Sequence, residues 1–257
     1  MSVKDCIGVI LDTETTGKGP DAKVIESARM VLAATPIEFS RIKPEDSYMA
    51  TKMYGLPDGA HIELGAMVVH GITDEEIAGL EPFSGFDYHG KFVVGHNVDY
   101  DVEITGYHGA SRICTLALAR WLWPHLDSHT QGAVLIHIGL LFKKGPQWGI
   151  DLCKGAHRAG HDVLNCSRIL KAMIHVMAKT EGMKHHVESW AALSELSMLA
   201  QIPKVMPFGK HKGVPVEDVP QDFLDWMYVT SDQSGWKHCR YLASAFRRAG
   251  KTVPENV

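Results

Sequence analysis

The sequence predicts an α/β protein built on a mixed five-stranded sheet that is flanked by helices. Short apolar runs open the chain, and later apolar runs alternate with segments of helical periodicity. Strands that come first, followed by alternating strands and helices, favour a mixed sheet covered by helices. The pattern breaks near residues 181–187 and resumes as a helix over 188–201. We therefore expect two parts, a domain over 1–182 and a small C-terminal α+β module over 188–257.

Each element follows from a local pattern. Apolar runs that end at turn residues predict strands over residues 6–15, 24–33, 38–42, 92–95 and 112–114. Helical spacing of apolar residues predicts helices over 62–68, from 74, from 99, and over 116–123, 131–142 and 162–179. Gly17 stops the first strand and Pro124 closes the helix that begins at 116. In the tail, a turn over 208–213 precedes a helix over 221–230.

Composition restricts the classes of partner. The 257 residues are 45% hydrophobic and 22% charged, which is typical of a folded protein. Because no run approaches the roughly 20 apolar residues of a membrane span and no signal-peptide pattern opens the chain, we expect a cytoplasmic protein without a membrane partner. A net charge of −4 argues against a global electrostatic grip on long nucleic acid, but it suits an enzyme that holds a few terminal nucleotides.

The most informative stretch is Leu11-Asp12-Thr13-Glu14-Thr15-Thr16-Gly17. On a strand, Asp12 and Glu14 share one face about 6.5–7 Å apart. Two carboxylates at the end of a buried strand repel each other and lose hydration, which is costly unless a cation lies between them. Oxygen ligands favour Mg²⁺ or Mn²⁺. Taken alone, the pair is also compatible with a solvated strand end.

Two later segments add polar groups of the same kind. The apolar run 92–95 leads into His96-Asn97-Val98-Asp99-Tyr100-Asp101, and Ala156-His157-Arg158-Ala159-Gly160-His161-Asp162 opens the longest helical pattern. Five residues correspond to about 500° of helical rotation, so His157 and Asp162 do not share a face of one regular helix. If His157 precedes the helix, it can lean over the same site as Asp162.

Together these segments resemble the three motifs of the DEDDh 3′–5′ exonucleases, a superfamily that includes polymerase proofreading subunits, oligoribonuclease and RNase T. Arg158 stands where the tyrosine subclass would have its tyrosine, so the histidine subclass fits better. Gly160 and His161 depart from the usual pattern. Residues 112–124, and 206–213 with 220–227, resemble the exonuclease X branch and its small C-terminal module. The resemblance implies a ribonuclease H-like fold.

The resemblance also implies roles for named residues. Two Mg²⁺ or Mn²⁺ ions would be held by carboxylates, with Asp12 bridging them, Glu14 and Asp162 completing the first site and Asp101 holding the second. His157 would accept the proton of the attacking water, because an imidazole titrates near neutral pH.

Contacts to the terminal nucleotide are expected from the turn Thr15, Thr16 and Gly17 and from His70 and Asn97. His70 is equally compatible with a purely structural turn, and Asn97 with a role in tying down the loop before Asp101.

The leading hypothesis is a 3′–5′ exonuclease that releases nucleoside 5′-monophosphates from DNA 3′ ends, single-stranded or frayed, in DNA repair or end processing. A 3′–5′ exoribonuclease resembling RNase T or oligoribonuclease is the alternative, since sugar preference depends on contacts near the 2′ position. A catalytically silent adaptor that binds nucleic-acid ends is a third reading. The sequence leaves both monomer and homodimer open.

Overall fold

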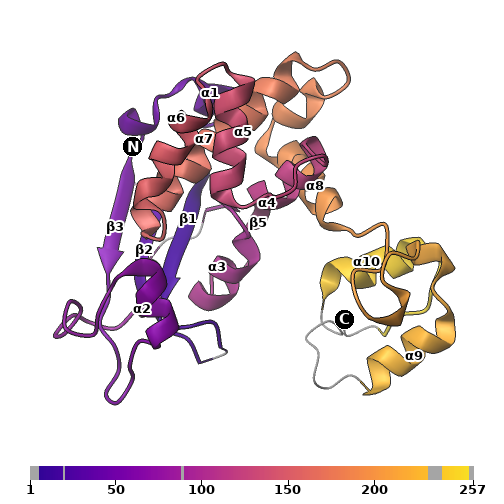
Figure 1. Ribbon diagram of the computed structural model, residues 1–257, viewed down its shortest axis with the longest axis horizontal. Helices are drawn as coiled ribbons and strands as arrows, with labels where there is room; N and C mark the ends of the chain where they lie inside the picture. The colour runs from indigo at the N-terminus through magenta and orange to yellow at the C-terminus, as the bar shows by residue number, and fades with distance from the viewer. Residues whose placement is uncertain (1–5, 20, 88–89, 231–238, 255–257) are drawn as a thin grey trace. The chain divides into compact units, whose positions relative to one another are not determined.

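The computed structural model describes residues 6–19, 21–87, 90–230 and 239–254 of the chain. The chain divides into two compact units, residues 1–197 and 198–257. The first unit contains the sheet and most of the helices, and the second is the smaller one (Figure 1).

The predicted mixed five-stranded sheet is confirmed. Its strands are β1 (Gly8–Thr15), β2 (Val24–Val31), β3 (Met49–Met53), β4 (Phe92–Gly95) and β5 (Ser111–Cys114). They lie in the order β3-β2-β1-β4-β5, so β1 is central. β1 pairs antiparallel with β2 and parallel with β4. Because a central strand is covered on both faces, the first residues of β1, Gly8 to Leu11, are all buried.

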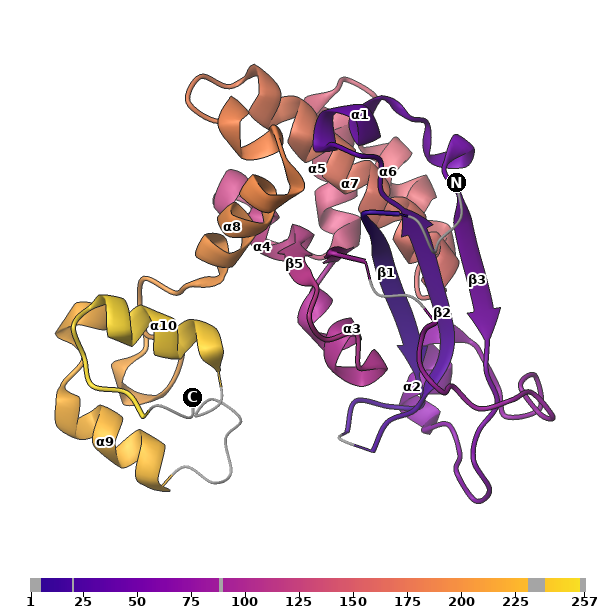
Figure 2. The same ribbon diagram turned by 180° about the vertical axis from the view of Figure 1, so that it is seen from behind.

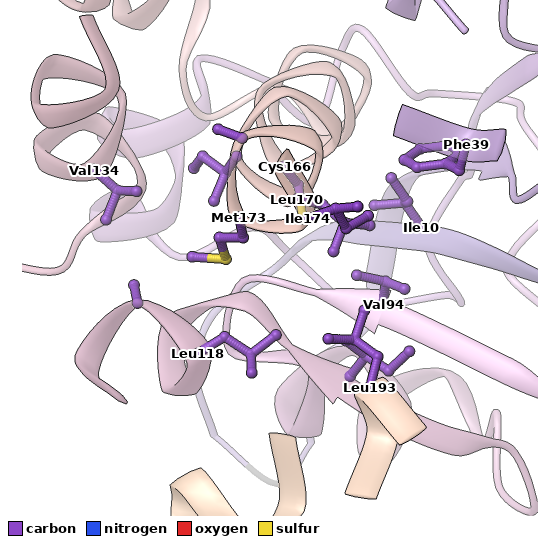
Figure 3. Close-up of a cluster of buried hydrophobic side chains, with 14 of the residues drawn as sticks. Ile10, Phe39, Val94, Leu118, Val134, Cys166, Leu170, Met173, Ile174 and Leu193 are labelled. Carbon is purple, nitrogen blue, oxygen red and sulfur yellow. The ribbon is translucent and has the colours of Figure 1, made fainter. Parts of the chain in front are cut away.

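The helices of the first unit are α1 (Pro36–Arg41), α2 (Leu64–His70), α3 (Val98–Thr105), α4 (Thr115–Leu122), α5 (Gln131–Leu141), α6 (Pro146–Leu152), α7 (Ala159–Lys179) and α8 (Trp190–Gln201). The longest, α7, packs across β1 and β2. Figure 3 shows how Leu170 and Ile174 of α7 meet Ile10 of β1 and Val94 of β4 in the main core. These apolar contacts hold the later half of α7 against the first half of β1.

The opposite face of the sheet has its own small core. Ile25 of β2 packs there with Ile62, Ile72 and Ile77 from the segment around α2, which lies near the end of β1 (Figure 2). The backbone N–H of Glu63, just before α2, donates to the carbonyl of Thr16 at 2.8 Å. This segment therefore fixes the turn that follows β1.

The third strand was predicted at the wrong place. Residues 36–41 form the helix α1, and the strand is β3, at 49–53. Pro36 occupies the first turn, and Thr35 caps the helix by accepting a hydrogen bond from the N–H of Glu38 at 3.2 Å. Such capping outweighs the weak strand pattern of a short segment. Asp74 likewise begins turns rather than a helix, and its carboxylate accepts a hydrogen bond from Ile62 N–H.

The boundary between the units lies later than the expected break at 182–188. Trp190, Leu193 and Leu196 of α8 are buried in the core of the first unit. The indole N–H of Trp190 also donates to the carbonyl of Ala33 at 2.8 Å. Most of α8 therefore closes the first unit rather than opening the second.

The second unit has a separate core formed by α9 (Gln221–Thr230), α10 (Arg240–Arg248) and the loops before them. Leu224, Leu242 and Phe246 are fully buried in it. In its described residues, the β structure is an isolated antiparallel bridge between Val205 and Pro215. Within the described chain, no helix is both long and apolar enough to cross a bilayer.

Candidate active site

Two carboxylates project from the end of the central strand. Asp12 and Glu14 of β1 are partly buried, and a register shift between Glu14 and Thr15 ends the regular pairing with β2. Alternation along the strand places both carboxylates on the face that α7 covers. The strand therefore delivers two acids to one spot beneath the first turn of a helix.

The third carboxylate of the cluster comes from that helix. Asp162 lies in the first turn of α7, and single oxygen atoms of Asp12, Glu14 and Asp162 all lie within 4.8 Å of one another. These are the three acids that the sequence assigned to the first metal ion. A group of three carboxylate oxygens at this spacing has the ligand chemistry that Mg²⁺ and Mn²⁺ prefer.

Asp101 approaches the cluster from a different element. It lies on α3, its side chain is buried, and it accepts a hydrogen bond from the Thr13 hydroxyl at 2.8 Å. It is not among the three residues whose oxygens lie within 4.8 Å of one another. Its charge nevertheless acts on Asp12, so the four acids form one electrostatic unit.

The pKa values of the carboxylates in this site are raised, so the site favours the binding of positive charge. Burial is the largest cause that raises the pKa of Asp12 well above its ordinary value, and the charges of Asp101, Asp162 and Glu14 add to it. Burial, followed by the charges of Asp162 and Glu26, raises the pKa of Glu14 to about 8. Burial also raises the pKa of Asp101 to about 7, against the opposing hydrogen bond from Thr13. Without cations the cluster retains protons near neutral pH.

An ion pair that sequence reasoning missed anchors the start of α7. Glu26 of β2 is 3% exposed and lies opposite Glu14 in the strand register. Its carboxylate accepts hydrogen bonds from the Arg158 guanidinium, the closest at 2.9 Å, and from the Ala159 N–H at 2.8 Å. An anion at the first N–H of a helix is favourable. The sign in the sequence was an acid directly after the apolar Val24 and Ile25 of a predicted strand.

The same anchor places His157 and Asp162. His157 lies two residues before α7, is exposed, and has a left-handed backbone conformation with φ of 65°. Its backbone N–H donates to the Asp162 carboxylate at 2.9 Å. The charge of His157 opposes the rise in the pKa of Asp162 that burial causes, so the imidazole lies near the cluster. His157 thus precedes the helix and is open to water.

Gly160, one of two residues that depart from the resembled motif, lies close to β3. A Cβ atom there would lie 3.1 Å from the Thr51 hydroxyl oxygen of β3. The absence of a side chain lets the first turn of α7 sit close to the sheet. The second unusual residue, His161, is exposed and packs over Gly155.

The turn after β1 is held by buried hydrogen bonds. Thr15, Thr16 and Gly17 are all buried. The hydroxyls of Thr15 and Tyr100 lie within hydrogen-bond distance of each other, at 2.7 Å, and their oxygens lie 2.8 and 3.0 Å from the carbonyl oxygen of Gly17. Tyr100, on α3, is a second contributor that sequence reasoning did not single out. Substrate contact by this turn stays a prediction.

His70 and Asn97 occupy contrasting environments. His70 is 6% exposed, and its Nδ1 accepts a hydrogen bond from Ile72 N–H at 3.0 Å, which places the proton of the neutral ring on Nε2. Burial lowers the pKa of His70. Asn97 is exposed, with φ of 81°, at the start of α3. The loop before Asp101 is tied by the neighbouring His96, which contacts the Thr115 hydroxyl and the His129 carbonyl. Substrate roles for His70 and Asn97 stay predictions.

Comparison with family models matched only part of the chain. Residues 194–236 match the family described as putative quorum-sensing-regulated virulence factor. This segment covers most of α8 and all of α9. It therefore describes a piece of the second unit and does not reach the carboxylate cluster.

Comparison with curated and solved proteins covers much more. Exodeoxyribonuclease 10 of Escherichia coli strain K12 is 23% identical over 231 residues, which span 87% of this chain and 91% of the relative. Among solved structures, exonuclease X in complex with 5′ overhanging duplex DNA has a TM-score of 0.49 and 23% identity over 68% of this chain and 96% of that one. The nuclease domain of 3′hExo, a DEDDh family member bound to rAMP, has a TM-score of 0.46 and 13% identity over 66% and 92%.

The curated similarity spans more residues than the first unit contains, so it extends over parts of both units. The three acidic motifs lie on the predicted mixed five-stranded sheet and on the helices that flank it. The chain is thus similar over most of its length to Exodeoxyribonuclease 10, and it resembles the DEDDh exonucleases in its motifs.

Proposed function

We propose that this protein is a metal-dependent 3′–5′ exonuclease that removes nucleoside 5′-monophosphates from DNA 3′ ends, in repair or end processing. One observation carries the proposal: three carboxylates from β1 and α7 gather their oxygens within 4.8 Å, where burial and mutual repulsion raise their pKa values. A cluster of acids with a purely structural role would lower the stability of the fold, because its carboxylates lose hydration and repel one another. Divalent cations remove that cost.

The donor set fits a pair of divalent ions. Asp12, Glu14 and Asp162 would hold one of them, and Asp101, with Asp12 shared, would hold the second. When bound, Mg²⁺ or Mn²⁺ supplies charge stabilisation for the attacking and leaving oxygens of an in-line displacement at phosphorus. The protein positions the ligands, because the four acids come from three rigid elements. Burial and the neighbouring charges set the pH at which these acids ionise.

His157 accepts the proton of the attacking water in this proposal. Its exposure and its position before α7 give the imidazole access to solvent beside Asp162. The Arg158–Glu26 ion pair and the bond from Ala159 N–H to Glu26 hold the two residues that follow His157. In this proposal, Thr15, Thr16 and Gly17, together with His70 and Asn97, contact the terminal nucleotide.

We propose DNA rather than RNA as the substrate because the curated relative is named an exodeoxyribonuclease. An exoribonuclease is the second candidate, since the nuclease domain of 3′hExo was solved with rAMP bound. Both readings share the same carboxylate chemistry. The difference lies in contacts around the 2′ position.

The test compares matched DNA and RNA single strands carrying a 5′ label, with Mg²⁺ or Mn²⁺ and with EDTA. We expect stepwise shortening from the 3′ end, faster on DNA, and none in EDTA. Asp12→Ala should abolish both cleavage and metal binding, whereas Lys179→Gln, a charge change at the far end of α7, should leave both unchanged. Faster cleavage of RNA would overturn the DNA assignment. Absence of mononucleotide release by the unmodified protein would favour the silent adaptor.

A further inference from the structure

The helix α10 of the second unit carries a strongly basic outer face. Arg240, Arg247 and Arg248 are exposed, and Lys251 follows just after the helix. Positions 240 and 247 are seven residues apart, so they lie on nearly the same side of the helix, with 248 beside them. Residues 239–254 contain no aspartate or glutamate. Four cations therefore occupy one stretch of 16 residues without an acid on it.

The other side of α10 fixes this face in place. Leu242, Ala243, Ala245 and Phe246 are buried at 5% exposure or less, in the core of the second unit. The Arg247 guanidinium donates to the carbonyl of Pro254 at 2.8 Å, which ties the following residues back to the helix. The basic groups are thus presented from a rigid element.

The acids of α9 hydrogen-bond within their own helix. On α9, Asp222 accepts a hydrogen bond from the N–H of Phe223, and Asp225 accepts one from the Gln221 side chain. Within the described parts of the chain, no ion pair involves Arg248 or Lys251. Their charge is available to a partner.

The two units differ in charge. Residues 198–257 contain eight Lys or Arg and six Asp or Glu, a formal charge of +2, whereas residues 1–197 contain 18 and 24, a formal charge of −6. A protein that cleaves DNA ends at an acidic cluster in the first unit needs another source of attraction for a polyanion. The basic face of α10 has the complementary charge.

We propose that the α10 face binds the phosphate backbone of the DNA strand whose 3′ end is cleaved. The inference rests on the proposed function for the choice of DNA as partner. Each phosphate contact by a cation releases counterions, so affinity depends steeply on salt. Because the two units belong to one chain, binding at α10 raises the local concentration of DNA ends at the first unit.

The test uses the full chain and the double variant Arg248→Gln/Lys251→Gln. The control is Lys179→Gln/Lys184→Gln, which makes the same change in net charge on exposed residues of the first unit. Fluorescence anisotropy with a labelled 20-nucleotide dT strand in EDTA gives Kd from 50 to 200 mM salt. Turnover of a dT trinucleotide with Mn²⁺ reports on the first unit alone, and thermal unfolding reports on folding.

Loss of two phosphate contacts should reduce the slope of log Kd against log salt by about 1.4 and weaken binding about tenfold at low salt. The control should bind as the unmodified protein does. Trinucleotide turnover should not change in either variant. Equal slopes for the double variant and the control would overturn the proposal. If no protein cleaves the trinucleotide, the proposed function fails, and the binding comparison still decides whether α10 holds DNA.

Discussion

Protonation of Glu14 should couple the stability of the metal-free protein to pH. The pKa of Glu14 is raised from 4.5 to about 8 by burial and by the neighbouring acids, so the folded state binds a proton that the unfolded chain releases between these values. The stabilisation that this bound proton gives the folded state is fully present below pH 4.5 and is lost as pH rises through 8. The loss is about 1.4 kcal/mol for each pH unit in that window.

The substitution Glu14→Gln isolates this contribution, because glutamine has no proton to lose. Water that reaches the partly exposed carboxylate reduces the full slope, so we expect about 2–4 kcal/mol between pH 5 and pH 8. In EDTA, the free energy of unfolding of the variant should rise by that amount relative to the unmodified protein over this interval. Urea unfolding followed by tryptophan fluorescence measures the difference.

Divalent cations should reverse the dependence of stability on pH in the unmodified protein. They bind ionised carboxylates, so stabilisation by Mn²⁺ should grow as pH rises, and Glu14→Gln should lose most of it. A matched control is Glu103→Gln, an exposed acid on α3 that pairs with Arg112. A difference between Glu14→Gln and the unmodified protein that stays constant from pH 5 to pH 8 would refute the electrostatic argument.

Three further substitutions separate the roles around the site. His157→Ala should lower kcat about 10²–10⁴-fold and leave Mn²⁺ affinity by calorimetry nearly unchanged; full activity would remove His157 from the mechanism. Arg158→Met leaves the buried Glu26 carboxylate without its cation, so unfolding should cost about 1–3 kcal/mol less, and an unchanged midpoint in urea would contradict that role. Tyr100→Phe removes hydroxyl contacts to the turn at Gly17, so KM for short DNA should rise while Mn²⁺ affinity stays constant. If the affinities for DNA and for Mn²⁺ fell equally, the substitution would have disturbed more than this turn.

Local patterns in the sequence determined most of the elements near the site. The strand that ends in Asp12 and Glu14, the strand over 92–95 and the helix that carries Asp162 all follow from apolar periodicity and turn residues. Such patterns are local, so they can be read without knowing what packs against them. They failed at residues 36–41, where a cap and a proline favoured a helix.

Contacts between distant segments could not be read from any local pattern. The approach of Asp162 to β1, the pairing of Glu26 with Arg158 across 132 positions of sequence, and the burial of Trp190 in the first unit arise only when the helices pack on the sheet. The sequence by itself determined which acids and which imidazole the protein carries and on what elements. Only the tertiary structure decided their distances, their burial and hence their raised pKa values, because repulsion and desolvation depend on neighbours brought together by packing.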